Sequence, residues 1–195
     1  MAEPQLVDPH DPVMTGENSF LRLSNDGGKT FVHRTSHWRV LWCPAGAGHV
    51  LLVQAELTGG KPRVYSDNIA MTRWLQKAIE SMLFPPTADP SIPVVEASFE
   101  RSGDPRAAAT ERIVSASDEI VMTWYDFNDP FVLTMAPGTA NRPIGVFSTF
   151  FPARAAQVTL NGQVAAGSVW PETRGDRQSS SACLAWSETW VKPKA

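Results

Sequence analysis

Helical periodicity is confined to one stretch of this chain, and that restriction does most to narrow the possible folds. Apolar side chains recur at helical spacing from Ile69 to Leu83, and the polar residues of the stretch fall largely on the opposite side, namely Arg73, Gln76, Lys77 and Glu80. Asp67 or Asn68 can cap the start of this helix. The Phe84–Pro86 run ends it, since a residue before proline avoids the helical region. A single amphipathic helix must bury its apolar stripe against a sheet or over the end of a barrel.

The rest of the chain consists of short β-prone segments separated by turn residues. Roughly a dozen segments occur at the spacing of about 8–12 residues that is typical of sandwiches and barrels. The clearest are 119–127, 182–191 and the hairpin 157–166, which turns at Asn161-Gly162. Because most links are hairpin-like, the sheet should be antiparallel. We therefore predict a mostly β fold, an antiparallel β-barrel of calycin-like architecture with the amphipathic helix at a barrel mouth. A two-sheet β-sandwich with one helix is the alternative.

Length and composition favour one domain. The chain has 195 residues with 43% hydrophobic content, enough for one sizeable core. Residues 1–18 carry prolines among acidic residues and are predicted to form an extended N-terminal arm, leaving 19–195 as a single β-barrel domain. No signal peptide and no run of roughly 18 apolar residues is present in the sequence. We therefore expect a cytoplasmic protein without membrane contact, and the alanine, proline and arginine content is typical of a GC-rich bacterial genome.

One short segment resembles a known structural motif. Residues 24–31 carry Ser24, Asp26, Gly28, Thr30 and Phe31 at the spacing of the Asp-box of sialidase-type β-propellers. In those proteins the box is a structural hairpin repeated across the blades. This chain has one copy and is too short for several four-stranded blades. We interpret the segment as convergent turn chemistry, in which Asp26 binds local backbone, and we carry over no glycosidase activity.

Charge and motif content exclude several classes of function. The net charge is −3 and no basic stripe occurs, so we expect no nucleic-acid partner. Cys43 and Cys183 are far apart and are expected to be buried thiols. The four histidines lack metal-ligand spacing, and no nucleotide-binding or hydrolase motif is present. We expect neither a metal nor a cofactor.

The last strand is the most informative segment for chemistry. Strict alternation would place Leu184, Trp186, Glu188 and Trp190 on one face, so that a carboxylate lies between two indoles. Burial there would raise the pKa of Glu188 toward neutrality, where it could act as a general acid or base. Two structural alternatives remain, because Glu188 could instead pair with an arginine, or the aromatic face could point outward.

Two functions follow from these residues. In the first, the barrel binds a small, largely apolar organic molecule, with Glu188 and Tyr65 as candidate catalytic groups; the ligand-binding candidates are Trp38, Trp42, Arg63, Trp124, Trp186 and Trp190. Such a protein could be a binding protein, or a cofactor-free isomerase, lyase or cyclase. In the second, the aromatic faces are buried between subunits, and the chain is a non-catalytic interaction or assembly protein. A homodimer is compatible with either.

Overall fold

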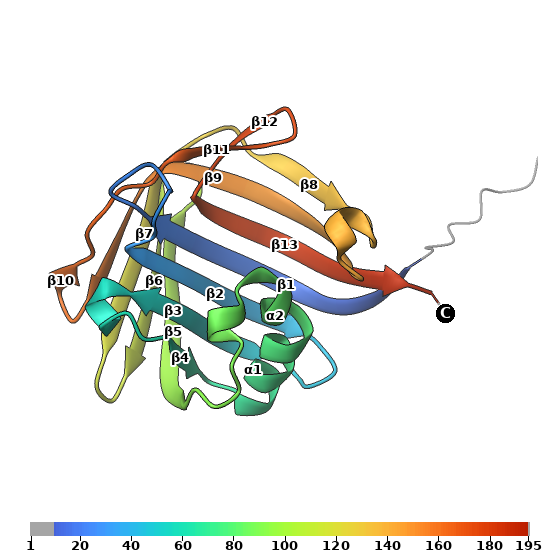
Figure 1. Cartoon of the computed structure of the whole chain (residues 1–195), viewed down its shortest axis with the longest axis horizontal. Coiled ribbons are helices and arrows are strands. Elements are labelled where there is room, and N and C mark those ends of the chain that lie inside the picture. Colours follow the sequence, from blue (N-terminus) through green and yellow to red (C-terminus); the bar gives the residue numbers. More distant parts are fainter. Residues whose placement is uncertain (1–9, 195) are drawn as a thin grey trace, which may run out of the picture.

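The computed structural model describes residues 10–194, which form a closed β-barrel of nine strands carrying one helical segment (Figure 1). The strands follow the order β9-β13-β1-β2-β3-β4-β5-β6-β7, and β7 pairs with β9 to close the ring. Their bounds are β1 (His10–Leu23), β2 (His33–Trp42), β3 (Gly48–Ala55), β4 (Arg63–Ser66), β5 (Val94–Asp104), β6 (Ala108–Ser115), β7 (Glu119–Phe127), β9 (Gly145–Leu160) and β13 (Ala182–Pro193). The predicted barrel with one helix is confirmed, while the likeness to calycins stays a prediction.

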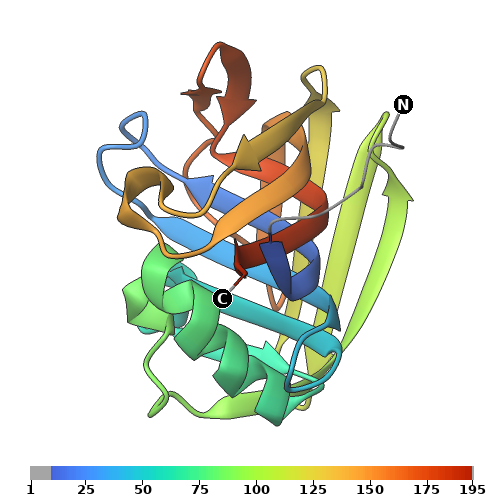
Figure 2. The same cartoon turned by 90° about the vertical axis from the view of Figure 1, so that its right-hand side faces the viewer.

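Four short strands lie outside this ring. The long strand β9 pairs with β8 (Phe131–Met135) along its first half and with β10 (Gln163–Val164) at its end. The remaining two, β11 (Pro171–Arg174) and β12 (Arg177–Ser180), form a separate hairpin. Both β8 and this hairpin project beyond the outer wall of the barrel (Figures 1 and 2).

The sheet is mixed, which corrects the antiparallel prediction. Strands β4 and β5 run parallel, with Val64 opposite Val94. Between them lie α1 (Ile69–Leu75), the π-helical turn η2 (Gln76–Glu80), α2 (Ser81–Leu83) and a 3-10 turn, η3 (Pro85–Thr87). This crossover returns the chain to the end of the barrel at which β4 began, so the next strand must be parallel.

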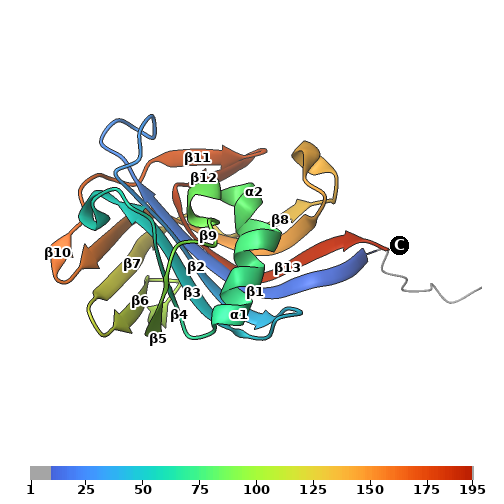
Figure 3. The ribbon, with the colours of Figure 1, turned by 60° about the horizontal axis from the view of Figure 1, so that its bottom comes forward.

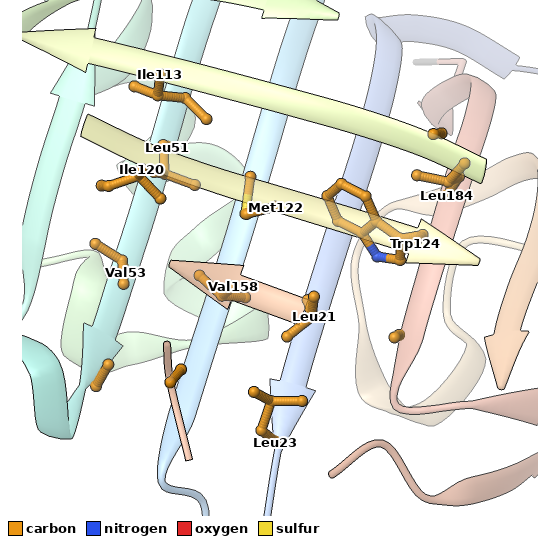
Figure 4. Close-up of a cluster of buried hydrophobic side chains, with 14 of the residues drawn as sticks. Leu21, Leu23, Leu51, Val53, Ile113, Ile120, Met122, Trp124, Val158 and Leu184 are labelled. Carbon is orange, nitrogen blue, oxygen red and sulfur yellow. The ribbon is translucent and has the colours of Figure 1, made fainter. Parts of the chain in front are cut away.

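The barrel interior is filled with side chains. Leu21, Leu51, Ile113, Met122 and Trp124 come from four different strands and are all buried in one cluster (Figure 4). Side chains on alternate positions of a strand point to opposite faces, so the neighbours of these residues point outward. The interior therefore forms a packed core.

The helical segment lies on the outer wall of the barrel and not at a mouth (Figure 3). Met71, Leu75 and Ile79 are buried against Trp38 and Leu52, which face outward from β2 and β3. A helix that links two neighbouring parallel strands packs on a face of their sheet, and the inner face is already occupied. The predicted position at the mouth is therefore wrong. Within residues 10–194, no helix has the length and hydropathy needed to cross a bilayer.

Two local predictions have different outcomes. Residues 10–18 of the predicted arm instead form the first part of β1, because β13 extends far enough to pair with them; positions 1–9 lie outside the described residues. The turn after β1 is confirmed, since Asp26 accepts hydrogen bonds from the Thr30 backbone at 2.9 Å and from the Thr30 hydroxyl at 2.6 Å. The hydrogen bond from the Ser24 hydroxyl and these two bonds from Thr30 lower the pKa of Asp26 to about 2.

Candidate functional site

A cavity of about 340 Å³ lies on the outer wall of the barrel, under the end of the helical segment. We call it the outer groove. Its floor comes from β1, β2, β9 and β13, and its walls from α2, β8, the loop before β9 and the β11–β12 hairpin. The groove is lined by Asn18, Phe20, Arg22, Arg34, Thr35, Ser36, Trp38, Glu80, Leu83, Leu133, Met135, Arg142, Val146, Phe150, Arg174, Glu188 and Trp190. Its volume is that of a small-molecule site at the lower end of the usual range.

A β-bulge in β13 directs Glu188 into this groove. Trp186 pairs with Thr149 and Thr189 with Phe147, so β13 holds one extra residue here, and Ser187 adopts a positive φ of 56°. An inserted residue reverses which face the following side chains occupy. Trp186 therefore packs with the interior cluster, while Glu188 and Trp190 face outward. The prediction that Glu188 lies between the two indoles is wrong for this reason.

Glu188 is a buried carboxyl without a cationic partner. Its residue is 5% exposed, and the Trp190 indole N–H donates to Oε2 at 3.0 Å. Desolvation raises the pKa of Glu188 to about 8, opposed by the hydrogen bond from Trp190 and assisted by the charge of Glu80. Among the described residues no ion pair reaches Glu188. The carboxyl is therefore protonated at neutral pH and can donate a hydrogen bond.

Glu80 is a second buried carboxyl in the groove, and sequence reasoning placed it on the polar side of the helix. In the structure Thr72, Gln76 and Glu80 form a buried row beside Met71, Leu75 and Ile79. The buried face of the helix is therefore broader than its apolar stripe, because the buried polar side chains find hydrogen-bond partners in the rest of the fold. Gln76 donates to the Thr87 carbonyl at 2.8 Å, and the Trp38 indole donates to Glu80 at 2.5 Å.

The two oxygens of Glu80 have different surroundings. Oε1 accepts hydrogen bonds from Trp38 and, at 3.1 Å, from the Ser36 hydroxyl. Oε2 is buried with no partner in residues 10–194. Desolvation raises the pKa of Glu80, while Trp38, Ser36 and the charge of Arg34 oppose the rise. The groove thus contains two carboxyls, each held by an indole.

Four arginines also line the groove. Arg22 and Arg174 both approach Glu172, at 2.8 and 3.4 Å. Arg34 lies over the Phe84 ring, 3.6 Å from its centroid, and donates to the Leu83 carbonyl at 3.0 Å. Desolvation lowers the pKa of Arg34 to about 10, opposed by Glu80. Arg142 approaches from the loop before β9.

The remaining predicted site residues do not meet in the groove. Tyr65 and Trp124 lie inside the barrel, where the Tyr65 hydroxyl donates to Asp118 at 2.8 Å. Arg63 also pairs with Asp118, at 3.3 Å. Trp42 is 48% exposed. Of the predicted set, the structure brings together only Trp38, Glu188 and Trp190.

A polar cluster inside the barrel was missed by sequence reasoning. Glu111 is fully enclosed by His37, Arg101 and Ser19, and Arg101 donates to it at 2.7 and 3.0 Å. Glu111 alternates with Ala109 and Ile113 on the inner face of β6, and that alternation is the signal that could have revealed it. No group of three potential metal ligands occurs within the described residues.

Comparisons with protein-family models, curated proteins and solved structures found no match to this chain. Its function is therefore inferred from the geometry of the groove.

Proposed function

We propose that the outer groove binds a small, largely apolar organic molecule and that Glu188 exchanges a proton or hydrogen bond with it. The observation that carries this proposal is the buried Glu188 carboxyl on the wall of an open cavity, without an ion-pair partner in residues 10–194. Burying an uncompensated carboxyl is destabilising, and such groups occur preferentially at functional sites. A structural role would be served as well by glutamine.

The rest of the lining supports an apolar ligand. Phe20 and Phe150 pack edge to face at the floor, with ring centroids 6.0 Å apart. Leu83, Leu133 and Met135 contribute further apolar surface from the walls. A molecule in this position would be in reach of the indoles of Trp38 and Trp190, whose ring centroids are 6.1 Å apart.

The chemistry open to this site is proton transfer. A carboxyl with a pKa near 8 is matched to general acid catalysis near neutrality, and it can protonate a carbonyl, an enol or a leaving hydroxyl. Such a step fits a cofactor-free isomerase, lyase or cyclase. Binding alone would use the same proton as a hydrogen-bond donor to a ligand oxygen.

Intrinsic tryptophan fluorescence tests the position of the site. We expect small aromatic and terpenoid-like compounds to quench the emission saturably, and a Trp190→Phe variant to lose most of that response. Trp124→Phe is the matched control, because Trp124 lies inside the barrel and does not line the groove. A response that is lost in Trp124→Phe and kept in Trp190→Phe would place the ligand inside the barrel and refute the proposal.

A pH titration of binding tests the role of Glu188. Affinity for a neutral compound with a carbonyl oxygen should fall as the pH rises through about 8, since the hydrogen-bond donor is lost. In Glu188→Gln, which keeps a donor at every pH, the affinity should not change with pH. If no compound binds and light scattering shows an oligomer that buries Trp190, the assembly function replaces this one.

A further inference from the structure

We infer that the ligand of the outer groove is an organic anion with an apolar body, a carboxylate, whose charged group is bound by Arg34 and Arg142. This inference rests on the proposed function, because it concerns the same groove. It starts from the charges of the four arginines. The lining holds four guanidinium groups and two carboxyls, and these charges are not matched pair by pair.

Two of the arginines share one protein carboxylate. Glu172, on β11, lies 2.8 Å from Arg22 and 3.4 Å from Arg174. The Arg22 guanidinium also lies against the Trp170 ring, 5.4 Å from its centroid. Arg22, on β1, thus ties the β11–β12 hairpin to the barrel wall, whereas Arg174 pairs with Glu172 within β11. Each of these arginines therefore has a protein carboxylate beside it.

Arg34 has no such partner. Its guanidinium is partly enclosed between the Phe84 ring and the groove, and one N–H is used by the Leu83 carbonyl. The charge of Glu80 raises the pKa of Arg34, yet neither oxygen of Glu80 forms an ion pair with Arg34. An arginine carries five N–H donors in a planar fork. The remaining donors of Arg34 have no protein acceptor in residues 10–194.

Arg142 is unpartnered as well. Its backbone is fixed by hydrogen bonds with Gly138 and Thr139, but its side chain makes no ion pair or hydrogen bond within the described part of the chain. It reaches the groove from the side of β8 and β9, whereas Arg34 reaches it from β2 below the end of the helix. The two free guanidinium groups therefore come from different walls of one cavity.

The two carboxyls do not balance these cations. Glu188 keeps its proton up to a pKa of about 8, so at neutral pH it contributes no negative charge. Glu80 directs Oε1 to Trp38 and Ser36 and forms no ion pair among the described residues. Together with Glu172 it can offset only two of the four arginine charges. An incoming carboxylate would supply the missing anion, and the planar fork of arginine binds a carboxylate through two parallel hydrogen bonds. The apolar lining would cover the rest of the molecule.

Calorimetric titration with a matched pair of compounds tests the inference. Phenylpropanoate and phenylpropanol share the same apolar body and differ in charge. We expect the carboxylate to bind at least about tenfold more tightly, the effect of a charge-assisted hydrogen bond. The preference should shrink between about 20 mM and about 300 mM salt, because screening weakens the contact with the partly exposed Arg142.

Arginine variants show which side chains bind the carboxylate group. Arg142→Gln should weaken phenylpropanoate binding about tenfold or more and leave phenylpropanol unchanged. Arg174→Gln is the matched control, since it removes the same charge from the same lining but Arg174 already has Glu172 as a partner. It should change the affinity less than about threefold. Arg34→Lys adds a second readout: it keeps the charge, loses the planar fork, and should also weaken the carboxylate selectively.

The outcomes separate this inference from the proposed function. If both compounds bind with equal affinity, or if Arg142→Gln and Arg174→Gln weaken the carboxylate equally, the groove binds small molecules but the anion site is refuted. If neither compound binds and no other small carboxylate or alcohol does, the proposed function fails as well. Selective loss of the carboxylate in Arg142→Gln supports both.

Discussion

Replacing Glu188 by glutamine should stabilise this protein at alkaline pH and change its stability little near pH 4. In the folded chain the Glu188 carboxyl keeps its proton up to about pH 8, whereas in the unfolded chain it ionises near 4.5. Between these values the folded state binds more protons than the unfolded state, so the free energy of unfolding falls as the pH rises. Glutamine has nearly the same shape and never ionises, so this loss is absent in the variant.

The size of the effect follows from the interval between the two pKa values. Each pH unit is worth about 1.4 kcal/mol, so the folded protein loses about 3 kcal/mol by pH 7 and about 5 kcal/mol above pH 8. The gain in Glu188→Gln should approach these values, because its side-chain carbonyl can still accept the hydrogen bond from Trp190. A gain of this size is unusual, since most substitutions of buried residues destabilise.

Urea unfolding followed by far-ultraviolet circular dichroism gives the free energy of unfolding, and measurements at pH 5, 7 and 9 test the prediction. Circular dichroism is preferred because tryptophan emission would respond to the changed contact at Trp190. Glu100→Gln is the control: its side chain is 70% exposed, and it should change stability by less than about 0.5 kcal/mol at every pH. If the free energies of unfolding of Glu188→Gln and the parent differ by the same amount at pH 5 and pH 9, burial does not raise the pKa of Glu188 as argued.

Two further substitutions probe buried groups elsewhere in the barrel. Burial lowers the pKa of His33 from 6.5 to about 4, and neither ring nitrogen has a partner within residues 10–194, so the parent should lose about 3 kcal/mol as the pH falls from 6.5 to 4. His33→Leu should remove most of that loss, measured as the slope of unfolding free energy against pH; an unchanged slope would contradict it. Glu111→Gln should destabilise by about 3 kcal/mol at pH 7 in urea unfolding, because His37 and Arg101 lose their carboxylate.

The pH dependence of the Glu111 variant provides its own check. Burial raises the pKa of Glu111, but the charges of His37 and Arg101 outweigh it, so the net pKa lies below 4.5. A depressed carboxyl stabilises the fold above its unfolded pKa, and this contribution disappears as the pH falls below 4.5. The destabilisation by Glu111→Gln should therefore shrink in acid, and a constant difference from pH 7 to pH 3 would argue against a charged pair.

Local sequence signals predicted the elements of this fold well. The strand Glu119–Phe127 has the bounds expected from its alternating pattern, and Asn161-Gly162 forms the turn after β9. The cap of the helix is also as expected, with the Asn68 side chain accepting from the Met71 N–H at 3.1 Å. Each of these features depends on residues within a few positions of one another. A sequence can specify such contacts directly.

The candidate site depended on contacts that the sequence does not display. The sequence predicted that Glu188 lies between Trp186 and Trp190. Because of the bulge at Ser187, Glu188 faces outward beside Trp190, while Trp186 faces the barrel interior. Glu80 resembled a solvent-facing helix residue until the Trp38 indole was placed beside it. The surroundings of Glu80 depend on a segment distant in the chain, and those of Glu188 depend on one inserted residue in β13. Neither leaves a periodic signal.

The sequence by itself therefore determined a β-rich chain with one amphipathic helix, its main turns and its two buried thiols. Only the tertiary structure decided that the barrel interior is filled, that the helix covers the outer wall, and that the cavity lies beside it. The physical reason is that alternation defines two faces of a strand without saying which one is inside. In this barrel both faces of β2 and β3 are buried, so hydrophobicity could not distinguish them.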